Sequence, residues 1–141
     1  NAAEFMEFCK KYPGKVTYPA LPDFTGSAFV RCLIYETCGW EQFQNMEADY
    51  DTVKAAIEPA LSYLRELNPY LWNQGKTFPD SSTTVDAMFA DGELVLDMSY
   101  GPFSVAPALR RGSTQIPPRL LSLITAPLET PTTWALLQLP Q

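Results

Sequence analysis

Apolar residues recur every three or four positions through most of the first 90 residues, a spacing that predicts amphipathic helices. Such helices are predicted at 4–11, at 27–37, and from Ser81 or Ser82 to about residue 90. A further helix should begin at Asp49 or Asp51, and it shows the clearest pattern: Val53, Ile57, Ala60, Leu61, Leu64 and Leu67. Because Pro59 lies inside this pattern, we expect a kink there or two abutting helices.

An almost continuous apolar run at 94–99 predicts a strand that is covered on both faces. A shorter β-prone run at 15–18 predicts another strand. A short helix is predicted at 104–111. Alternating helices and strands of this kind predict an α/β fold with a central, mostly parallel sheet and flanking helices. We expect this unit to occupy residues 3–111.

The last thirty residues follow a different pattern. From 112 to 141 only Arg119 and Glu129 are charged, and prolines interrupt any helical or alternating period. Residues 120–124 are a candidate strand. We therefore treat 112–141 as an atypical, proline-rich tail.

Composition excludes several classes of function. The chain has 141 residues, a formal net charge of -6 and no histidine. An acidic chain without a long basic run is a poor binder of nucleic acid, and the lack of histidine excludes Ser-His-Asp triads and His-ligated metals. Cys32 and Cys38 would lie about 9 Å apart in a helix, beyond disulfide reach. No metal site and no cofactor are expected.

The segment with the strongest candidate chemistry is the helix start at Thr25, Gly26 and Ser27. First-turn amides lack partners within their helix, Gly26 allows close approach to the backbone, and two hydroxyls can donate. A polar or anionic ligand group would fit this site. Ordinary N-capping by Thr25 or Ser27 is the alternative.

A second candidate site lies at the carboxyl end of the 94–99 strand. Tyr100 could contact a ligand there, and Gly101 and Pro102 could form a hinge. Asp97 could pair with a cationic ligand, although a hydrogen-bonded structural role would also explain it.

Two tryptophans and an acidic cluster are further candidates. Trp40 and Trp72 could line a pocket, and core packing is the alternative. The carboxylates of Glu47, Asp49 and Asp51 could serve acid–base chemistry. A solvated helix start explains them better.

Several strings together resemble the periplasmic solute-binding components of ABC importers, in the type II branch that includes thiamine-, spermidine- and iron-type receptors. The resemblance spans about residues 4–112. The strings that carry it are Gly14-Lys15-Val16-Thr17-Tyr18-Pro19, Pro22-Asp23-Phe24-Thr25-Gly26-Ser27-Ala28-Phe29, Asn68-Pro69-Tyr70-Leu71-Trp72, Gly75-Lys76-Thr77-Phe78-Pro79 and 91–103.

The resemblance implies a fragment that supplies about one of two α/β lobes, with a small polar solute captured in the cleft between them. It implies a binding protein rather than an enzyme, in the periplasm or otherwise outside the cytoplasm, with the importer's membrane subunits as partners. Thr25, Gly26 and Ser27 would face the cleft, and Tyr100 would lie near the crossover to the other lobe.

The tail departs from this resemblance. Read one nucleotide earlier, suitable codons for 126–134 give Gly-Thr-Ile-Gly-Asn-Thr-His-Tyr-Val, which looks like in-frame sequence of the same family. A frameshift near Gly112 is therefore one hypothesis for the tail, and a native proline-rich tail is the other.

Two functions of other classes are also open. One is a small hydrolase with Ser27 as nucleophile and a lysine or carboxylate as base. The other is an interaction domain that forms homo-oligomers through an exposed sheet edge.

Overall fold

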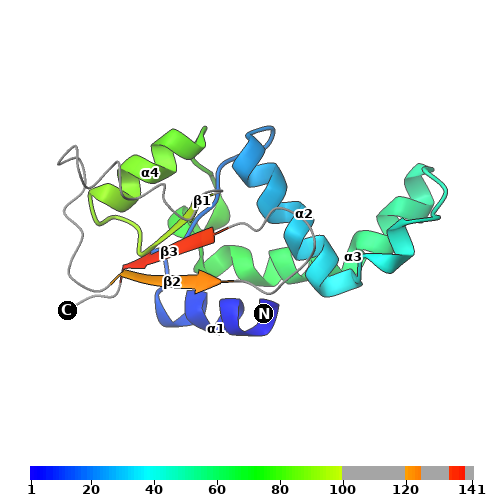
Figure 1. Ribbon diagram of the computed structural model, residues 1–141, viewed down its shortest axis with the longest axis horizontal. Helices are drawn as coiled ribbons and strands as arrows, with labels where there is room; N and C mark the ends of the chain where they lie inside the picture. The colour runs from blue at the N-terminus through cyan, green and yellow to red at the C-terminus, as the bar shows by residue number, and fades with distance from the viewer. Residues whose placement is uncertain (100–119, 125–133, 139–141) are drawn as a thin grey trace.

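The computed structural model describes residues 1–99, 120–124 and 134–138. In this part the chain forms helices, short 3-10 turns and a small sheet (Figure 1). The α-helices are α1 (Ala2–Lys11), α2 (Phe24–Cys38), α3 (Tyr50–Leu67) and α4 (Ser82–Ala90). The 3-10 turns are η1 (Glu41–Phe43), η2 (Asn68–Tyr70) and η3 (Trp72–Gly75), and the strands are β1 (Leu96–Ser99), β2 (Leu120–Ile124) and β3 (Trp134–Gln138).

All four predicted helices in this part are confirmed, and their caps explain where they begin. Asp49 caps α3 by accepting from the amides of Asp51 and Thr52, and Ser81 caps α4 through Thr84. Helix α2 begins three residues earlier than predicted because Asp23, not Thr25 or Ser27, is its N-cap. Thr25, Gly26 and Ser27 therefore form its first turn.

Pro59 does not divide α3. The helix runs without interruption from Tyr50 to Leu67, so the alternative of two abutting helices is wrong. Proline removes one amide donor from a helix. The Asp49 cap and the burial of Ala60 and Leu67 stabilise the helix on either side of that gap.

The predicted fold class is wrong. Helices make up 63% of residues 1–99, and the sheet has the order β1-β3-β2 with both pairings antiparallel. In register, Asp97 lies opposite Leu136, and Leu123 lies opposite Ala135. This is neither a central parallel sheet with flanking helices nor an α/β type II periplasmic-binding-protein fold.

Residues 15–18 do not form the predicted strand, because their backbone bonds are divided between two segments. The carbonyl of Lys15 accepts from the amide of Val95, at 2.9 Å, and that of Val16 accepts from Trp72, at 2.8 Å. A single hydrogen bond to each neighbouring segment does not form the ladder of a β-sheet. The candidate strand at 120–124 is confirmed as β2. The predicted helix at 104–111 lies outside the described residues, and the division of the chain at residue 112 stays a prediction.

The main core lies where α1, the end of α3 and β1 meet. Its buried members include Met6 and Cys9 of α1, Leu67 of α3, and Leu96 and Met98 of β1. Burial raises the pKa of the Cys9 thiol to about 12, so that sulfur is inert at neutral pH. A second cluster of Val85, Phe89 and Leu94 joins α4 to the segment that leads into β1, with Trp72 and Met88 packed against it.

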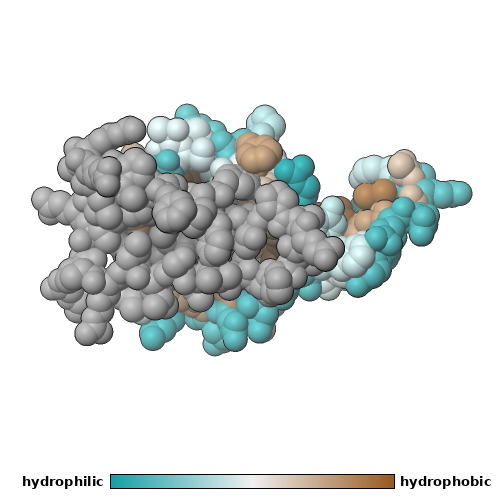
Figure 2. Space-filling view, viewed as in Figure 1, coloured by the Kyte–Doolittle hydropathy of each residue, from teal (hydrophilic) through white to brown (hydrophobic). Residues whose placement is uncertain are grey.

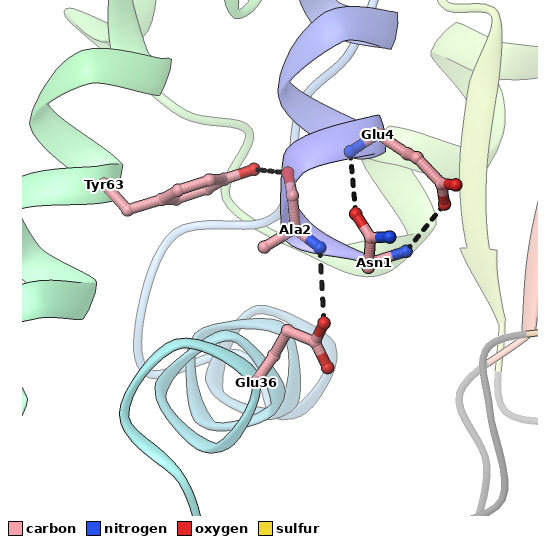
Figure 3. A network of polar contacts seen from close by, with 5 residues as sticks. All are labelled: Asn1, Ala2, Glu4, Glu36 and Tyr63. Atoms are coloured by element: carbon pink, nitrogen blue, oxygen red, sulfur yellow. Dashed lines mark hydrogen bonds and ion pairs between the residues drawn. The ribbon is translucent and has the colours of Figure 1, made fainter.

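The start of α1 is tied to two other helices (Figure 3). The amide of Ala2 donates to the Glu36 carboxylate of α2, at 3.4 Å, and the hydroxyl of Tyr63 in α3 donates to the Ala2 carbonyl, at 2.5 Å. Burial, more than any neighbouring charge, raises the pKa of Tyr63 to about 12 and keeps the hydroxyl a donor. These bonds fix α1 over the core.

The end of α2, the segment leading to α3 and the first turns of α3 project from the rest of the chain (Figure 1). Figure 2 shows hydrophobic surface on this projection among hydrophilic surface. Trp40 and Tyr50 are its most exposed large aromatic residues, at 43% and 76% of their full surface.

Candidate functional site

The Asp23 carboxylate occupies the helix start that the sequence marks as a candidate anion site. Its Oδ1 accepts from the amide of Thr25, at 2.7 Å, and from that of Gly26, at 3.1 Å. The amide of Ser27 donates to the backbone carbonyl of Asp23, at 2.9 Å. All three first-turn amides therefore have acceptors within the protein, and a ligand anion would have to displace this carboxylate.

The same carboxylate also caps a second helix. Oδ2 of Asp23 accepts from the amide of Ser82, the first residue of α4, at 3.2 Å. Burial works to raise the pKa of Asp23, but the hydrogen bonds from Gly26, Ser82 and Thr25 outweigh it, and the net shift is downward. Asp23 is therefore an ionised carboxylate that joins the starts of α2 and α4.

Loss of this double cap should destabilise the protein more than loss of a single one. We expect Asp23→Ala to lower the free energy of unfolding by about 2 kcal/mol, the upper range for a cap, because amides of two helices lose their acceptor. Asp49→Ala is the matched control, since Asp49 accepts two amides of one helix only. Urea unfolding of both variants checks this, and equal losses would contradict a joint role for Asp23.

Gly26 is required by the protein's own packing. A Cβ at this position would lie 2.1 Å from the carbonyl oxygen of Pro19 and 3.0 Å from its carbonyl carbon. The first turn of α2 thus packs directly on the backbone of the preceding segment. The sequence predicts that Gly26 lets a ligand approach the backbone. In the structure the group that approaches Gly26 is the carbonyl of Pro19.

Asp97 is the buried acid of the predicted strand, and only 8% of its surface is exposed. Its Oδ1 accepts from the amide of Met98, at 2.8 Å. The carboxyl of Asp86, on α4, acts on it electrostatically. The alternative of a hydrogen-bonded carboxyl in this strand agrees with the bond from Met98.

Burial is the main reason that the pKa of Asp97 is raised to about 7, and the negative charge of Asp86 adds to it. The pKa of Asp86 is also raised, chiefly by partial burial of its carboxyl although the residue as a whole is exposed, and the charge of Asp23 contributes.

These contacts bring some of the candidate residues together. Thr25, Gly26 and Ser27 are bound by Asp23, Asp23 acts electrostatically on Asp86, and Asp86 acts in the same way on Asp97. We call Asp23, Asp86 and Asp97 the acid junction, because they link the start of α2, α4 and β1. Asp97 is the second residue of β1, so the junction lies before the carboxyl end of the strand, where the sequence predicts a ligand.

Other candidate residues lie elsewhere. Trp40 follows the far end of α2, whose last residue, Cys38, lies about 20 Å along the helix from Thr25. Trp72 packs on the second core cluster, and its Nε1 donates to Glu93, at 2.7 Å. Tyr100, Gly101 and Pro102 lie outside the described residues.

The cluster of Glu47, Asp49 and Asp51 is exposed at the start of α3, where Asp49 is the cap, which agrees with a solvated helix start. No group of three or more His, Cys, Asp or Glu residues in the described part of the chain could hold a metal ion. The three cysteines are free, and none of them begins a helix.

Sequence reasoning missed Asp23 and Asp86. Asp23 carried a usable signal, because aspartate is among the strongest N-cap residues and it directly precedes the helix. Asp86 carried none, because a polar residue on an exposed helix position is ordinary. Only the tertiary contact with β1 gives it a role.

Comparison with known proteins gives one curated relative. The chain is similar to Protein YnjB of Escherichia coli (strain K12), with 39% identity over 97 residues, which is 69% of this chain. The chain spans about a quarter (25%) of the length of that relative. No family profile matches the chain. No solved structure matches it either. None of the helices among the described residues has the length and apolar character needed to cross a membrane.

Proposed function

We propose that this chain is part of the substrate-binding component of an ABC-type importer and captures a small, positively charged solute at the acid junction. The observation that carries the proposal is the buried carboxyl of Asp97 in β1, on which the negative charge of Asp86 in α4 acts, while Asp23 at the start of α2 acts on Asp86. The strings that resemble importer binding proteins support the importer role.

The charge balance of the junction favours a cation over an anion. The α2 amides that would bind an anion already donate to Asp23, so the junction offers carboxyl oxygens in place of free amide donors. An ammonium group can donate up to three hydrogen bonds to such oxygens. The net charge of -6 would also raise the local concentration of cationic solutes.

This proposal includes the partners and the place of action that the resemblance implies. The chain would act outside the cytoplasm and deliver its solute to the importer's membrane subunits. Its similarity to one quarter of a longer relative is consistent with further solute contacts from residues beyond this chain. Binding by this chain alone should therefore be weak.

Amide NMR of the isotopically labelled chain tests the proposal. We expect spermidine, a cationic amine, to shift the amides of 23–27 and 96–99 in about 150 mM salt, where long-range charge attraction is screened. Phosphate and glucose, as anionic and neutral probes, should leave these amides unchanged. Shifts with phosphate but not spermidine, or no clustered shift with any probe, would overturn the proposal.

Two variants separate a specific site from general attraction to acidic surface. Asp97→Asn should abolish the spermidine shifts, whereas Asp91→Asn, at the exposed end of α4, should retain them. Amides near Asp49 and Asp51 provide an internal reference for non-specific binding. Equal shifts there and at the junction would also count against the site.

A further inference from the structure

The projection that is formed by the end of α2, η1 and the start of α3 has no core of its own (Figure 1). Between Leu33 of α2 and Ala60 of α3, a stretch that the structure describes in full, no residue is buried. Large apolar and aromatic side chains are nevertheless frequent there: Ile34, Tyr35, Trp40, Phe43, Met46, Tyr50, Val53 and Ile57. Apolar side chains that are concentrated in one exposed region mark a surface of interaction.

Local bonds give the projection its shape. The amide of Gly39 ends α2 by donating to the carbonyl of Tyr35, at 3.0 Å. The ring of Phe43 lies edge-on to that of Tyr35, with 5.8 Å between the ring centres. The cap of Asp49 then begins α3. These turns hold the exposed rings in place without a partner, which lowers the entropy cost of binding one.

The outer part of the projection, residues 39–53, carries charge of one sign only. We call this segment the acidic tip. It contains no lysine or arginine, and its four acids are all exposed: Glu41, Glu47, Asp49 and Asp51. Trp40 directly precedes one of these acids, and Tyr50 lies between two of them. The two most exposed rings of the tip therefore each stand next to a carboxylate in the chain.

An exposed ring beside carboxylates suits a cationic side chain. A guanidinium or ammonium group gains cation–π attraction over the ring face and a charge-assisted hydrogen bond from the carboxylate. One such contact exists within the chain itself, because Nζ of Lys54 lies 5.5 Å from the centre of the Tyr50 ring. Indole binds cations more strongly than phenol does, so Trp40 is the better ring for the same contact with a partner.

We propose that the acidic tip is a docking surface for a partner protein that presents lysine or arginine side chains beside an apolar patch, with Trp40 and Tyr50 as the main contacts. The rings supply most of the affinity, and the carboxylates select a basic partner. A second copy of the chain fits this surface less well, because a symmetric pair of tips would bring like charges together. The proposal does not depend on a solute at the acid junction, which includes the opposite end of α2.

Amide NMR of the full, isotopically labelled chain tests this docking surface. The probe is a peptide of leucine and lysine, about 15 residues long so that it can form an amphipathic helix. In about 150 mM salt, it should shift the amides of 39–53 more than those of α1 or α4. A peptide of the same pattern with glutamate in place of lysine should leave the tip unchanged. Equal shifts from both peptides, or shifts spread evenly over the chain, would overturn the proposal.

Two ring substitutions locate the contact. Trp40→Ala and Tyr50→Ala should each weaken binding of the leucine–lysine peptide by about 5-fold to 30-fold, the range for aromatic contacts that matter at an interface. Leu21→Ala, at an exposed apolar residue outside the tip, should leave binding unchanged. All three side chains are exposed, so the variants should fold. Unchanged binding in both ring variants would contradict the proposal.

The contribution of charge is measured with Glu47→Gln, which leaves the Asp49 cap intact. Loss of one exposed carboxylate should weaken peptide binding by about 2-fold to 5-fold in about 20 mM salt, and by less in about 150 mM salt. Asp91→Asn, at the end of α4, removes one exposed charge outside the tip and should have no effect. An effect of Asp91→Asn as large as that of Glu47→Gln would show general attraction to an acidic protein and overturn the proposal.

Two further measurements distinguish the partner from other occupants of the same surface. Sedimentation should give the same size for the wild type and for Tyr50→Ala, and phosphatidylcholine vesicles should leave the amides of the tip unchanged. A dimer that Tyr50→Ala dissociates would assign the tip to a second copy of the chain. Vesicle-induced shifts in the tip would assign it to a membrane. Either result would overturn the proposal of a basic partner protein.

Discussion

Gly26→Ala is expected to lower the free energy of unfolding by about 3 kcal/mol or more, the severe end of overpacking. A methyl group there would lie 2.1 Å from the carbonyl oxygen of Pro19, and backbone atoms cannot rotate away as a side chain can. Relief would need α2 to move from the 19–20 segment. That movement would also disturb the Asp23 cap that joins α2 to α4.

Gly92→Ala is the matched control. Gly92 has a positive φ of 76°, and a Cβ there would meet nothing within 4 Å. It therefore isolates the cost of a left-handed backbone conformation for an alanine, about 1–2 kcal/mol. Urea unfolding of both variants measures the difference. If Gly26→Ala were no worse than Gly92→Ala, the close packing of α2 on Pro19 would be wrong.

Leu67→Ala is expected to lower the free energy of unfolding by about 2–5 kcal/mol, as for other large-to-small changes in a core. Leu67 is 0% exposed and lies at the end of α3, in the cluster shared with α1 and β1. The cavity would remove contacts from three elements at once. The 3-10 turn η2 begins directly after Leu67, and the chain continues from it to Leu71.

Leu21→Ala serves as the control for the same change of side chain. Leu21 is 60% exposed, so its truncation should cost less than about 0.5 kcal/mol. Thermal and urea unfolding should both show that Leu67→Ala is less stable than Leu21→Ala. A Leu67→Ala variant as stable as Leu21→Ala would mean that α3 does not end in the core.

The helices could be predicted because their signals are local. Caps such as Asp49 and Ser81, a terminator such as Gly39, and the three- and four-residue apolar spacing all act within one or two turns. The sheet could not be predicted in this way. The apolar run around β1 is equally compatible with parallel or antiparallel partners, and its neighbour β3 lies some forty residues further along the chain.

The residues of the candidate site also differ in whether local sequence could predict their roles. Asp97 was predictable because a charged residue within an apolar strand needs a partner. The influence of Asp86 on it was not, since only folding brings α4 to β1. The role of Gly26 was inferred for a ligand, whereas the structure gives a steric reason in Pro19. Local sequence marks unusual residues, but tertiary contacts decide what each one does.

The central claim is that the acid junction receives a cationic solute. Carbon-13 NMR titration of the Asp86 and Asp97 carboxyls, with and without spermidine, tests it most directly. Without spermidine, Asp97 should titrate with a pKa of about 7. With spermidine the pKa should fall, because a bound cation stabilises the ionised carboxylate. Ordinary titration of Asp97 without spermidine would contradict its burial beside the charge of Asp86, and an unchanged curve with spermidine would contradict solute binding.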